Sequence, residues 1–523
     1  MEDTQRIYTT LKQVFGYDEF RPGQEELVTA LLDGRDALGV MPTGAGKSLC
    51  FQLPALLMEG ATVVVSPLVS LMNDQVTSLV AMGVRAAYFN QSLTPGQYQK
   101  ALGLAMQGRY KIIYVAPERL ATPRFAALAQ VLPISMVVVD EAHCVSQWGM
   151  NFRPDYLAVA DFVASLPARP VVAAFTATAT GRVRADIEEL LHLQNPAQVT
   201  TGFDRPNLYY GVMRPRSKDS ALLELLEHHA EDSCIVYCAT RKETERVAGM
   251  LTDRGIEARC YHAGMEQEAR RASQEDFVFD RARVMVATNA FGMGIDKSNV
   301  RLVVHYNMPK DLESYYQEAG RAGRDGEEAD CVLLYAPKDV KLNQFLIEHS
   351  DPAPGITEEQ AAQLQANDQE RLRQMTFYST GKTCLRARIR RYFGEYAPKE
   401  CGFCSVCAPR PWLEDHTDDF EWDTQPELTR RPRRTVPIQE EGLPYPEELY
   451  RRLKELRTAL ARCRGCLPTW CLPTPPCGPC ADGSPPTWPG WGRCPAWASG
   501  SCASTGRIFS RRFMRGSRSI DRR

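Results

Sequence analysis

The chain has 523 residues, of which 44% are hydrophobic and 24% charged, and its formal net charge is −2. This length exceeds what one hydrophobic core holds, so we expect two to four domains, and the composition excludes a disordered chain, a collagen-like repeat and a bundle of membrane helices. The near-neutral charge excludes a non-specific polycation. No apolar run reaches the roughly 18 residues of a membrane-spanning helix and no export signal begins the chain, so we expect a soluble, cytoplasmic protein.

Residues 20–340 alternate between short apolar runs and longer amphipathic stretches, a pattern typical of parallel sheets covered by helices on both faces. In the first half, the apolar runs cover 62–66, 111–115, 135–140 and 170–175. The amphipathic stretches, which predict helices, cover 21–33, 47–58, 69–82 and 181–192. A second series of apolar runs covers 233–238, 257–261, 283–287, 301–306 and 330–335. We therefore predict an α/β fold of two tandem doubly wound domains, joined near residues 200–210.

A Gly-rich segment (MPTGAGKS) follows the apolar run DALGV and precedes a helical stretch. This strand–loop–helix order predicts a phosphate-binding loop, because backbone N–H groups and a helix N-terminus then face an anion. Lys47 would reach the β- and γ-phosphates of a nucleotide, and Ser48 would hold Mg²⁺. The predicted nucleotide-binding residues are Met41, Pro42, Thr43, Gly44, Ala45, Gly46, Lys47 and Ser48. A Gly-rich turn without a ligand is the alternative.

An acidic pair, Asp140 and Glu141, follows the apolar run that begins at residue 135. A carboxylate at the C-terminal end of a parallel strand faces the same crevice as the phosphate-binding loop. We expect Asp140 to hold Mg²⁺ together with Ser48, and Glu141 to orient or deprotonate the water that attacks the γ-phosphate. Such a pair alone is often a solvated strand end, but its combination with the loop favours the catalytic interpretation.

The second half contains the turn 317–326 (QEAGRAGRDG), in which glycines separate two arginines. The turn would let Arg321 and Arg324 approach a polyanion closely, and a guanidinium on the γ-phosphate in the transition state accelerates hydrolysis by about 10³–10⁵-fold. Since the turn and the phosphate-binding loop lie in different predicted domains, hydrolysis would depend on closure of the cleft between them. The alternative is a surface loop with solvated arginines.

Residues 340–410 are helical and Arg-rich, and they contain four cysteines with metal-ligand spacing: Cys384, Cys401, Cys404 and Cys407. A CxxCxxC run with one further thiol upstream is typical of a closed tetrahedral zinc site, which contributes about 10–16 kcal/mol to the folding of small domains. Redox-active cysteines are the alternative. Several nearby arginines suit a DNA backbone, although half of them are expected to be only solvated: Arg371, Arg373, Arg386, Arg388, Arg390 and Arg391.

The composition changes after residue 410. Residues 411–444 are rich in proline and charge, which is typical of a linker, and an amphipathic helix is predicted to begin near Pro446. Residues 463–523 contain no Lys or Glu and are rich in Cys, Pro and Trp without a hydrophobic period. We interpret this tail as unstructured and as the product of a frame-shifted translation. A Cys-rich metal-binding tail is the alternative.

Together, these motifs resemble those of superfamily 2 helicases of the RecQ family, over residues 10–340 and into the cysteine cluster. The matching motifs, in order, are FGYDEFRPGQEE (15–26), SPLVSLMNDQ (66–75), APERL (116–120), DEAH (140–143), FTATAT (175–180), FDRPN (203–207), YHAG (261–264), ATNAFGMGIDK (287–297) and ESYYQEAGRAGRDG (313–326). The resemblance implies two RecA-like domains followed by a helical zinc-binding subdomain. It also implies an ATP- and Mg²⁺-dependent helicase that moves 3′ to 5′ on single-stranded DNA and unwinds duplex or branched DNA in recombination and repair.

The resemblance also suggests domain boundaries. In chain order, the two RecA-like domains, the zinc-binding subdomain, the linker, an HRDC-like start and the anomalous tail are expected at 1–205, 206–338, 339–410, 411–444, 445–462 and 463–523. In RecQ proteins a winged-helix domain usually follows the zinc module. The linker here is too short to hold one, so we expect that domain to be absent and the HRDC domain to be truncated.

Individual roles also follow from the resemblance. Tyr17 and Arg21 would flank the adenine base and Gln24 would read its edge, while Gly294 and Asp296 would lie near the nucleotide. The implied catalytic residues are Lys47, Asp140, Glu141, His143, Gln317, Arg321 and Arg324, with Arg324 as the arginine finger. Thr176 and Thr178 would couple the nucleotide state to the position of DNA.

The segment 144–156 (CVSQWGMNFRPDY) resembles the aromatic-rich loop of the family, which senses single-stranded DNA. The expected DNA contacts are Trp148, Phe152, Arg153, Ser66 and Asn73, and each stacked base contributes about 1–3 kcal/mol. Trp148, Phe152 and Tyr156 would offer stacking faces to bases, and a buried aromatic cluster is the alternative for Phe152 and Tyr156. The sequence departs from the family at Met150, where histidine is usual, and at Asn151, where aspartate is usual, which bears on how DNA binding triggers hydrolysis.

Two other functions are weighed against a DNA helicase. One is an RNA-directed ATPase with the same motor architecture, which FRPGQ and the cysteine module disfavour. The other is a DNA-binding or strand-annealing protein without motor activity, which the intact Lys47, Glu141 and Arg324 disfavour. The partners expected for a helicase are single-stranded, forked or branched DNA and single-strand-binding or other recombination proteins, with the chain itself a monomer.

Overall fold

A computed structural model of the chain describes residues 2–149, 152–291, 297–350 and 356–414. The HRDC-like helix, the tail and most of the predicted linker lie outside the described residues. Four residues singled out above also lie outside them: Met150, Asn151, Gly294 and Asp296. None of the helices in the described ranges is both long and apolar enough to cross a membrane.

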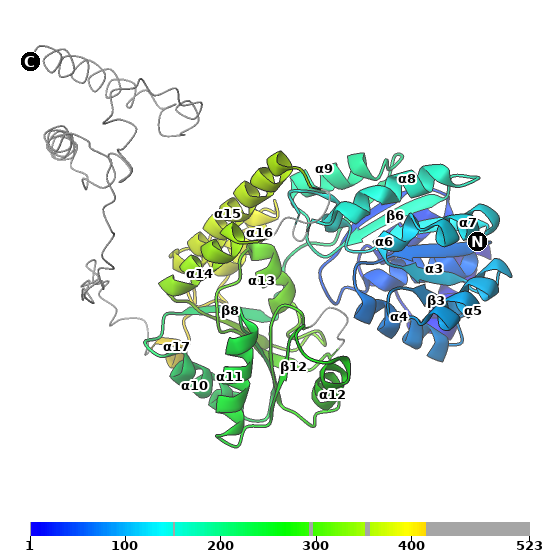
Figure 1. The fold of residues 1–523 in the computed structure, drawn as a ribbon. Coiled ribbons are helices and arrows are strands. Elements are labelled where there is room, and N and C mark those ends of the chain that lie inside the picture. The colour runs from blue at the N-terminus through cyan, green and yellow to red at the C-terminus, as the bar shows by residue number, and fades with distance from the viewer. Residues whose placement is uncertain (1, 150–151, 292–296, 351–355, 415–523) are drawn as a thin grey trace, which may run out of the picture. The chain divides into compact units, whose positions relative to one another are not determined.

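The first half forms a seven-stranded parallel sheet in the order β3-β4-β2-β5-β6-β1-β7 (Figure 1). Its strands are β1 (Ala37–Val40), β2 (Ala61–Val65), β3 (Ala86–Phe89), β4 (Ile112–Val115), β5 (Ile134–Val139), β6 (Val171–Thr176) and β7 (Ala197–Thr200). Adjacent residues of β2, Val63 and Val64, are both buried but belong to different hydrophobic clusters, so the sheet is covered on both faces. This double burial explains the continuous β-branched runs in the sequence.

The helices around this sheet complete a unit that we call the front lobe. They are α1 (Glu2–Thr10), η1 (Leu11–Phe15), α2 (Gln24–Leu32), α3 (Lys47–Leu57), α4 (Val69–Ala81), α5 (Pro95–Met106), α6 (Pro117–Leu120), α7 (Pro123–Val131), η2 (Ala142–Val145), η3 (Pro154–Leu157), α8 (Ala158–Ser165) and α9 (Gly181–Leu190). Because β5 lies between β2 and β6, and β6 lies beside β1, the loops that follow these strands meet at one edge of the sheet.

The second half forms a six-stranded parallel sheet in the order β10-β11-β9-β12-β13-β8. We call it, with its helices, the rear lobe: β8 (Leu208–Met213), α10 (Lys218–His228), β9 (Ser233–Tyr237), α11 (Arg241–Thr252), β10 (Ala258–Tyr261), α12 (Gln267–Val278), β11 (Val284–Ala287), β12 (Val300–His305), α13 (Leu312–Ala319) and β13 (Ala329–Leu334). Its neighbours Val303 and Val304 again lie in different clusters, so this sheet is also buried on both faces. The two sheets confirm the predicted tandem α/β architecture, and the segment 201–207 joins them.

A helical module follows the rear lobe. It consists of α14 (Pro337–Glu348), α15 (Glu358–Thr380), α16 (Leu385–Tyr392) and α17 (Pro411–Glu414). The last helix covers the beginning of the predicted linker, where Trp412 stacks on His228 of the rear lobe with ring centroids 5.0 Å apart. The chain is therefore ordered against the rear lobe through residue 412, slightly beyond the cysteine cluster.

Candidate active site

The phosphate-binding loop lies between β1 and α3, as predicted. Gly44 and Gly46 have φ angles of 85° and 81°, in the left-handed region that favours glycine, and Gly46 caps the N-terminus of α3. Lys47 is the first residue of this helix, and its Nζ donates to the carbonyl oxygen of Met41 at 3.1 Å. Burial lowers the pKa of Lys47, while the charges of Glu141 and Asp140 oppose this shift. The loop thus presents a helix N-terminus and one ammonium group to an anion.

The acidic pair lies at the same edge, directly after β5. Ser66 Oγ donates to Asp140 Oδ2 at 3.4 Å, and Glu141 has a φ of 49°, an unusual backbone conformation for a non-glycine residue at this position. Burial raises the pKa of both carboxyl groups, the charge of Glu141 adds to the shift of Asp140, and Lys47 opposes it. Two carboxylates that repel each other beside a hydroxyl are a donor set that fits a divalent cation such as Mg²⁺.

His143 connects the acidic pair to the next strand. Its Nδ1 lies 3.3 Å from Glu141 Oε2 and 2.8 Å from Thr176 Oγ1, at the end of β6. Burial, followed by the positive charge of Lys47, lowers the pKa of His143 to about 3. The imidazole is therefore neutral at physiological pH and acts as a hydrogen-bonding group in this network.

The network continues into the rear lobe. Thr176 Oγ1 donates to the carbonyl oxygen of Thr178 at 3.1 Å, and Nε2 of Gln317 on α13 donates to Thr178 Oγ1 at 3.3 Å. The predicted coupling residues thus form a chain of polar contacts from Glu141 through His143 to Gln317. This chain physically connects the acidic pair of one lobe to the arginine-bearing turn of the other.

Arg321 and Arg324 follow α13 and face the front lobe. A Cβ atom placed on Gly44 would lie 3.4 Å from Cγ of Arg324, and the charge of Arg324 contributes to lowering the pKa of Lys47. Arg321 is buried, and its charge opposes the raised pKa of Glu141. Both guanidinium groups therefore lie within electrostatic reach of the phosphate-binding loop and the acidic pair, where an arginine finger must lie.

Arg205 is a site residue that sequence reasoning missed, although it lies in the matched motif FDRPN. Its Nη1 donates to the carbonyl oxygens of Thr43 at 3.4 Å and Gly320 at 3.3 Å. Its Nη2 donates to those of Ala322 at 3.0 Å and Gly323 at 3.1 Å. Arg205 thus fixes the arginine-bearing turn and reaches the phosphate-binding loop from the segment that joins the lobes.

The residues expected to bind adenine lie against the phosphate-binding loop. Arg21 donates to the carbonyl oxygen of Gly44, and Gln24 Nε2 donates to those of Ala45 at 3.0 Å and Gly46 at 3.1 Å. Tyr17 is 53% exposed, which leaves its ring open to a stacking partner. Gln24 therefore supports the loop directly, a contact that the motif alone did not predict.

The structure separates the residues expected to contact DNA into two groups. Trp148, Phe152, Arg153 and Asn73 are partly exposed. The guanidinium of Arg182 lies 3.1 Å from the centroid of the Trp148 ring, and Arg153 Nη1 donates to the carbonyl oxygen of Pro67 at 3.1 Å.

Ser66 and Tyr156 form the second group, because both are wholly buried. Ser66 donates to Asp140, and Tyr156 Oη donates to the Asp140 carbonyl oxygen at 3.0 Å. This placement contradicts a direct DNA contact for Ser66 and a base-stacking role for Tyr156. Both side chains instead hold Asp140 in place, and for Tyr156 the alternative of a buried core aromatic is the correct one.

The four cysteines of the helical module converge. The sulfur atoms of Cys384, Cys401, Cys404 and Cys407 all lie within 4.8 Å of one another, a spacing that fits a tetrahedral zinc ion with four thiolate ligands. Cys384 caps α16 by accepting from the N–H of Ala387 at 3.4 Å.

The cysteine knuckle also pairs with the rear sheet. Cys404 forms a parallel bridge with Tyr210 of β8, and the N–H of Ser405 donates to the Tyr210 carbonyl oxygen at 2.9 Å. Arg386 is buried and donates to the carbonyl oxygen of Leu208 at 2.7 Å, so this arginine binds protein rather than a DNA backbone. The metal site is therefore attached to the edge strand of the rear sheet.

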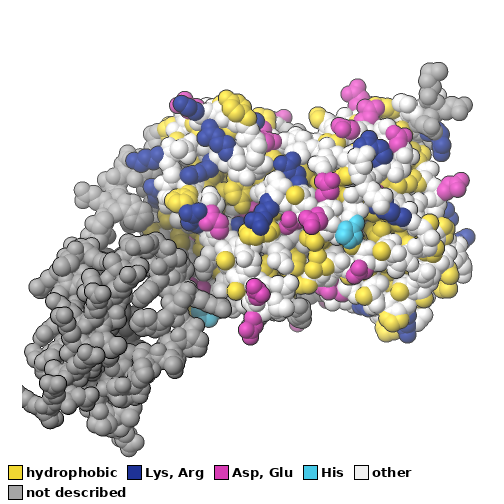
Figure 2. All heavy atoms as spheres, turned by 90° about the horizontal axis from the view of Figure 1, so that it is seen from above, with side chains coloured by type: hydrophobic (Ala, Val, Ile, Leu, Met, Phe, Trp, Pro, Cys, Tyr) yellow, Lys and Arg dark blue, Asp and Glu magenta, His cyan; other side chains and the backbone are white. Residues whose placement is uncertain are grey.

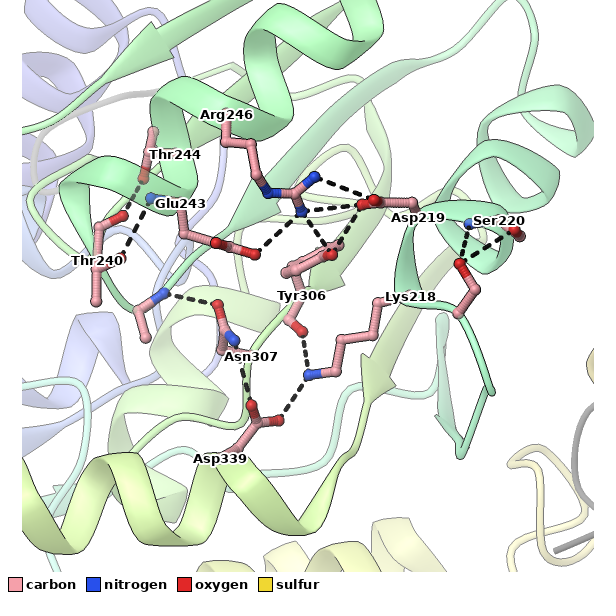
Figure 3. Close-up of polar contacts among 12 residues, drawn as sticks. Lys218, Asp219, Ser220, Thr240, Glu243, Thr244, Arg246, Tyr306, Asn307 and Asp339 are labelled. Carbon is pink, nitrogen blue, oxygen red and sulfur yellow. Dashed lines mark hydrogen bonds and ion pairs between the residues drawn. The ribbon is translucent and has the colours of Figure 1, made fainter. Parts of the chain in front are cut away.

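A second polar network lies at the carboxyl edge of the rear sheet (Figure 3). Nζ of Lys218, which is buried, donates to Asp339 Oδ2 at 2.7 Å and to the carbonyl oxygen of Tyr306 at 2.6 Å. Arg246 donates to Asp219 and to Tyr306 Oη, the latter at 2.7 Å. These contacts tie α10, α11 and β12 to the first helix of the helical module.

Comparison with known proteins gives matches along the same ranges. The families described as DEAD/DEAH box helicase, helicase conserved C-terminal domain and RecQ zinc-binding match residues 21–187, 217–326 and 337–408. An ATP-dependent DNA helicase RecQ of Bacillus subtilis is 44% identical over 417 residues, which cover 80% of this chain and 69% of that protein. One of Pasteurella multocida is 43% identical over 418 residues, which cover 80% of this chain and 64% of that protein.

These matches thus span about two thirds of the length of the curated relatives. Among solved structures, Saccharomyces cerevisiae Dbp5 bound to RNA and ADP BeF3 superimposes with a TM-score of 0.53 at 19% identity. The superposition covers 70% of this chain and 97% of that one. At this identity the likeness concerns the fold alone, and it identifies both lobes as RecA-like.

Proposed function

The chain belongs to the RecQ family of ATP-dependent DNA helicases, and on this basis we propose that it moves 3′ to 5′ on single-stranded DNA and unwinds duplex or branched DNA in recombination and repair. We further propose that it acts in the cytoplasm as a monomer and works beside single-strand-binding or other recombination proteins. The domain boundaries predicted from the sequence are part of this proposal.

One observation carries the proposal: catalytic groups from two lobes surround one anion site. Lys47 and the acidic pair belong to the front lobe, whereas Arg324, which approaches Gly44, belongs to the rear lobe. Neither lobe alone contains the full set, so the rate of hydrolysis depends on how the lobes are placed. A polymer that binds both lobes and changes their placement then controls hydrolysis, which is the requirement for a motor.

Each residue has a role that follows from its position. The backbone of the loop and Lys47 bind the β- and γ-phosphates, and Ser48 and Asp140 would hold Mg²⁺, which neutralises charge on the phosphates when it is bound. Glu141 orients the attacking water, and His143 and Ser66 hold the acidic pair in position. Arg321 and Arg324 stabilise the negative charge that develops on the γ-phosphate.

The substrate assignment rests on exposed groups of the front lobe and on charge. Trp148 and Phe152 offer partly exposed rings to bases, and Arg153 offers a cation to phosphate. Figure 2 shows Lys and Arg side chains spread over the displayed face among acidic ones, as expected for a chain with a net charge of −2 whose nucleic-acid contacts are local.

The test is unwinding of a forked DNA duplex by the full chain with ATP and Mg²⁺. We expect strand separation on substrates with a 3′ single-stranded tail, little on substrates with only a 5′ tail, and none with Lys47→Ala. Lys100→Ala is the matched control, because Lys100 is exposed on α5, the helix that follows the edge strand β3 of the front sheet.

ATPase stimulation by single-stranded DNA and RNA distinguishes the two nucleic acids. Stronger stimulation by RNA would favour the RNA-directed ATPase, and DNA binding without ATP-dependent strand separation would favour the annealing protein.

A further inference from the structure

Two side chains of helix α15, in the helical module, bind the backbone of the segment 147–149. This segment follows residues 140–143 (DEAH) of the front lobe, which we call the catalytic box. Nη1 of Arg371 donates to the carbonyl oxygens of Trp148 at 3.0 Å and Gly149 at 2.8 Å. One turn earlier on the same helix, Asn367 Nδ2 donates to the carbonyl oxygen of Gln147 at 3.2 Å. Two side chains of the helical module thus bind three consecutive carbonyl groups of the front lobe.

The segment 147–149 packs directly on the catalytic box. A Cβ atom on Gly149 would lie only 2.1 Å from the carbonyl oxygen of His143, so no residue other than glycine fits there without a shift of the backbone. The N–H of Trp148 donates to Ser146 Oγ at 3.1 Å. His143 in turn contacts Glu141 and Thr176. A shift of Gly149 would therefore move the backbone of a residue that contacts both the acidic pair and the strand leading to the other lobe.

Arg371 also faces the rear lobe. It is 9% exposed, and Nη2 donates to Asp368 on its own helix. Burial lowers the pKa of its guanidinium, but the negative charges of Asp311, Asp368 and Glu313 outweigh burial and raise it. Asp311 and Glu313 are buried at the start of α13, the helix that carries Gln317, so one guanidinium binds the front lobe and lies within electrostatic reach of two carboxyl groups of the rear lobe.

We propose that Arg371 is a positioning residue that holds segment 147–149 against the catalytic box, so that the zinc-bearing helical module takes part in coupling DNA binding to ATP hydrolysis. The proposal rests on the proposed function, because it presupposes an ATPase that DNA stimulates. Trp148 lies within the held segment, so DNA that stacks on its ring displaces a segment that Arg371 and Asn367 hold from the helical module. While Arg371 holds the segment, its displacement moves the backbone of His143. Without Arg371, the segment can shift by itself and His143 stays in place.

The experiment measures ATP hydrolysis by the full chain with and without saturating oligothymidylate, together with zinc content and the melting temperature. We expect Arg371→Ala to lower the ratio of stimulated to unstimulated rate by at least about fivefold, the lower end of typical coupling between sites. Arg371→Lys keeps a positive charge near Asp311 and Glu313, but its single nitrogen cannot occupy the positions of both Nη1, which binds the two carbonyl oxygens, and Nη2, which binds Asp368. We therefore expect it to melt near the wild-type temperature, to retain zinc and still to show the reduced ratio.

Arg271→Ala is the matched control, because Arg271 is exposed on α12 of the rear lobe and pairs with Glu275 on the same helix. We expect its ratio at saturating DNA to stay within about twofold of the wild type. Asn367→Ala removes the Gln147 contact, together with a hydrogen bond from Gln363 within α15, and leaves Arg371 in place. It should lower the ratio by about twofold or more, and it tests the inference if Arg371→Ala does not fold.

A folded, zinc-loaded Arg371→Lys variant with the wild-type ratio would overturn the inference, as would an equal loss in Arg271→Ala. A wild-type chain whose ATPase does not respond to DNA would contradict the proposed function itself.

Discussion

Arg324 of the rear lobe lies against Gly44 of the front lobe, where a Cβ atom on the glycine would be 3.4 Å from Cγ of the arginine. The contact places a cation from the arginine-bearing turn of one lobe beside the phosphate-binding loop of the other. The glycine thus serves two purposes, since it adopts a left-handed backbone conformation and leaves room for the arginine.

Arg324→Ala should abolish most of the ATPase activity without weakening ATP binding. Because a guanidinium on the γ-phosphate acts chiefly in the transition state, we expect kcat to fall by about 10³-fold or more and the Kd of ATP to change little. Steady-state kinetics and equilibrium binding of a fluorescent ATP analogue measure the two effects. Arg301→Ala is a suitable control, because Arg301 pairs with Asp325 on the same turn. A comparable loss of kcat in the control would contradict the role of Arg324.

Gln24→Ala should weaken ATP binding through the phosphate-binding loop. The substitution leaves the carbonyl oxygens of Ala45 and Gly46 without the donors they have here, and two neutral hydrogen bonds together contribute about 1–3 kcal/mol. We expect KM for ATP to rise about tenfold, with a smaller change in kcat. Glu25→Gln is the control, because Glu25 is exposed on the same helix and accepts from Tyr8. An unchanged KM would show that Gln24 does not support the loop.

Removal of zinc should unfold the helical module before the lobes. The four thiols hold together a segment whose α16 is highly polar, and zinc contributes about 10–16 kcal/mol in such small modules. We expect a chelator or Cys404→Ser to produce a separate, earlier unfolding transition and proteolysis between residues 381 and 410. Cys260→Ser, which changes a thiol outside the cluster, should keep a wild-type melting profile. A single unchanged transition after complete metal removal would contradict this expectation.

His229 should make stability depend on pH near neutrality. Its Nδ1 lies 2.8 Å from Asp232 and its Nε2 lies 3.1 Å from Asp330, which also accepts from Arg410. Burial lowers the pKa of His229, but the hydrogen bonds and charges of Asp330 and Asp232 outweigh burial and raise it.

Because the folded-state pKa lies above the unfolded value, the contribution of His229 is complete below about pH 6.5 and is lost as pH rises through the folded pKa. Urea denaturation of the wild type and His229→Gln should therefore differ most near pH 6 and converge once the pH exceeds the folded-state pKa. His349→Gln, on the surface of α14, serves as the control. A difference that grows with pH would contradict the assignment.

Lys218→Met should destabilise the rear lobe strongly. The substitution leaves Asp339 buried without its cation, and breaking one partner of a buried pair costs about 3–5 kcal/mol. The urea midpoint should fall accordingly, and Lys218→Met with Asp339→Asn should recover part of the loss because no unpaired charge then remains. A double variant as unstable as the single one would show that the pair is not the cause.

The sequence predicted most of the two sheets because their central strands are continuous apolar runs. The short edge strands carried weaker signals: β7 alternates buried and exposed residues over only four positions, and β3 is also four residues long. At the edge of a sheet only one side of a strand is paired, so fewer apolar residues are needed. The motif residues of the phosphate-binding loop, the acidic pair and the arginine-bearing turn were found because fixed local spacing is required for their chemistry.

The remaining site residues depend on tertiary contacts that no local pattern contains. Ser66 ends a strand and looks available to DNA, yet its neighbours bury it against Asp140. Arg205 and Arg371 are single arginines in segments rich in charge, and only the packed structure shows that each binds backbone carbonyl groups of another lobe. Local sequence gives the identity of a donor, whereas the acceptor is set by chain segments far away.

The bridge between Cys404 and Tyr210 has a further consequence for self-association. Strand β8 is the outermost strand of the rear sheet, and its free side would otherwise offer unpaired amide and carbonyl groups to another polypeptide. The cysteine knuckle occupies part of that side, so the metal that shapes the knuckle also shields the sheet from intermolecular strand addition. Loss of the ion would therefore expose a template for aggregation as well as loosen a subdomain.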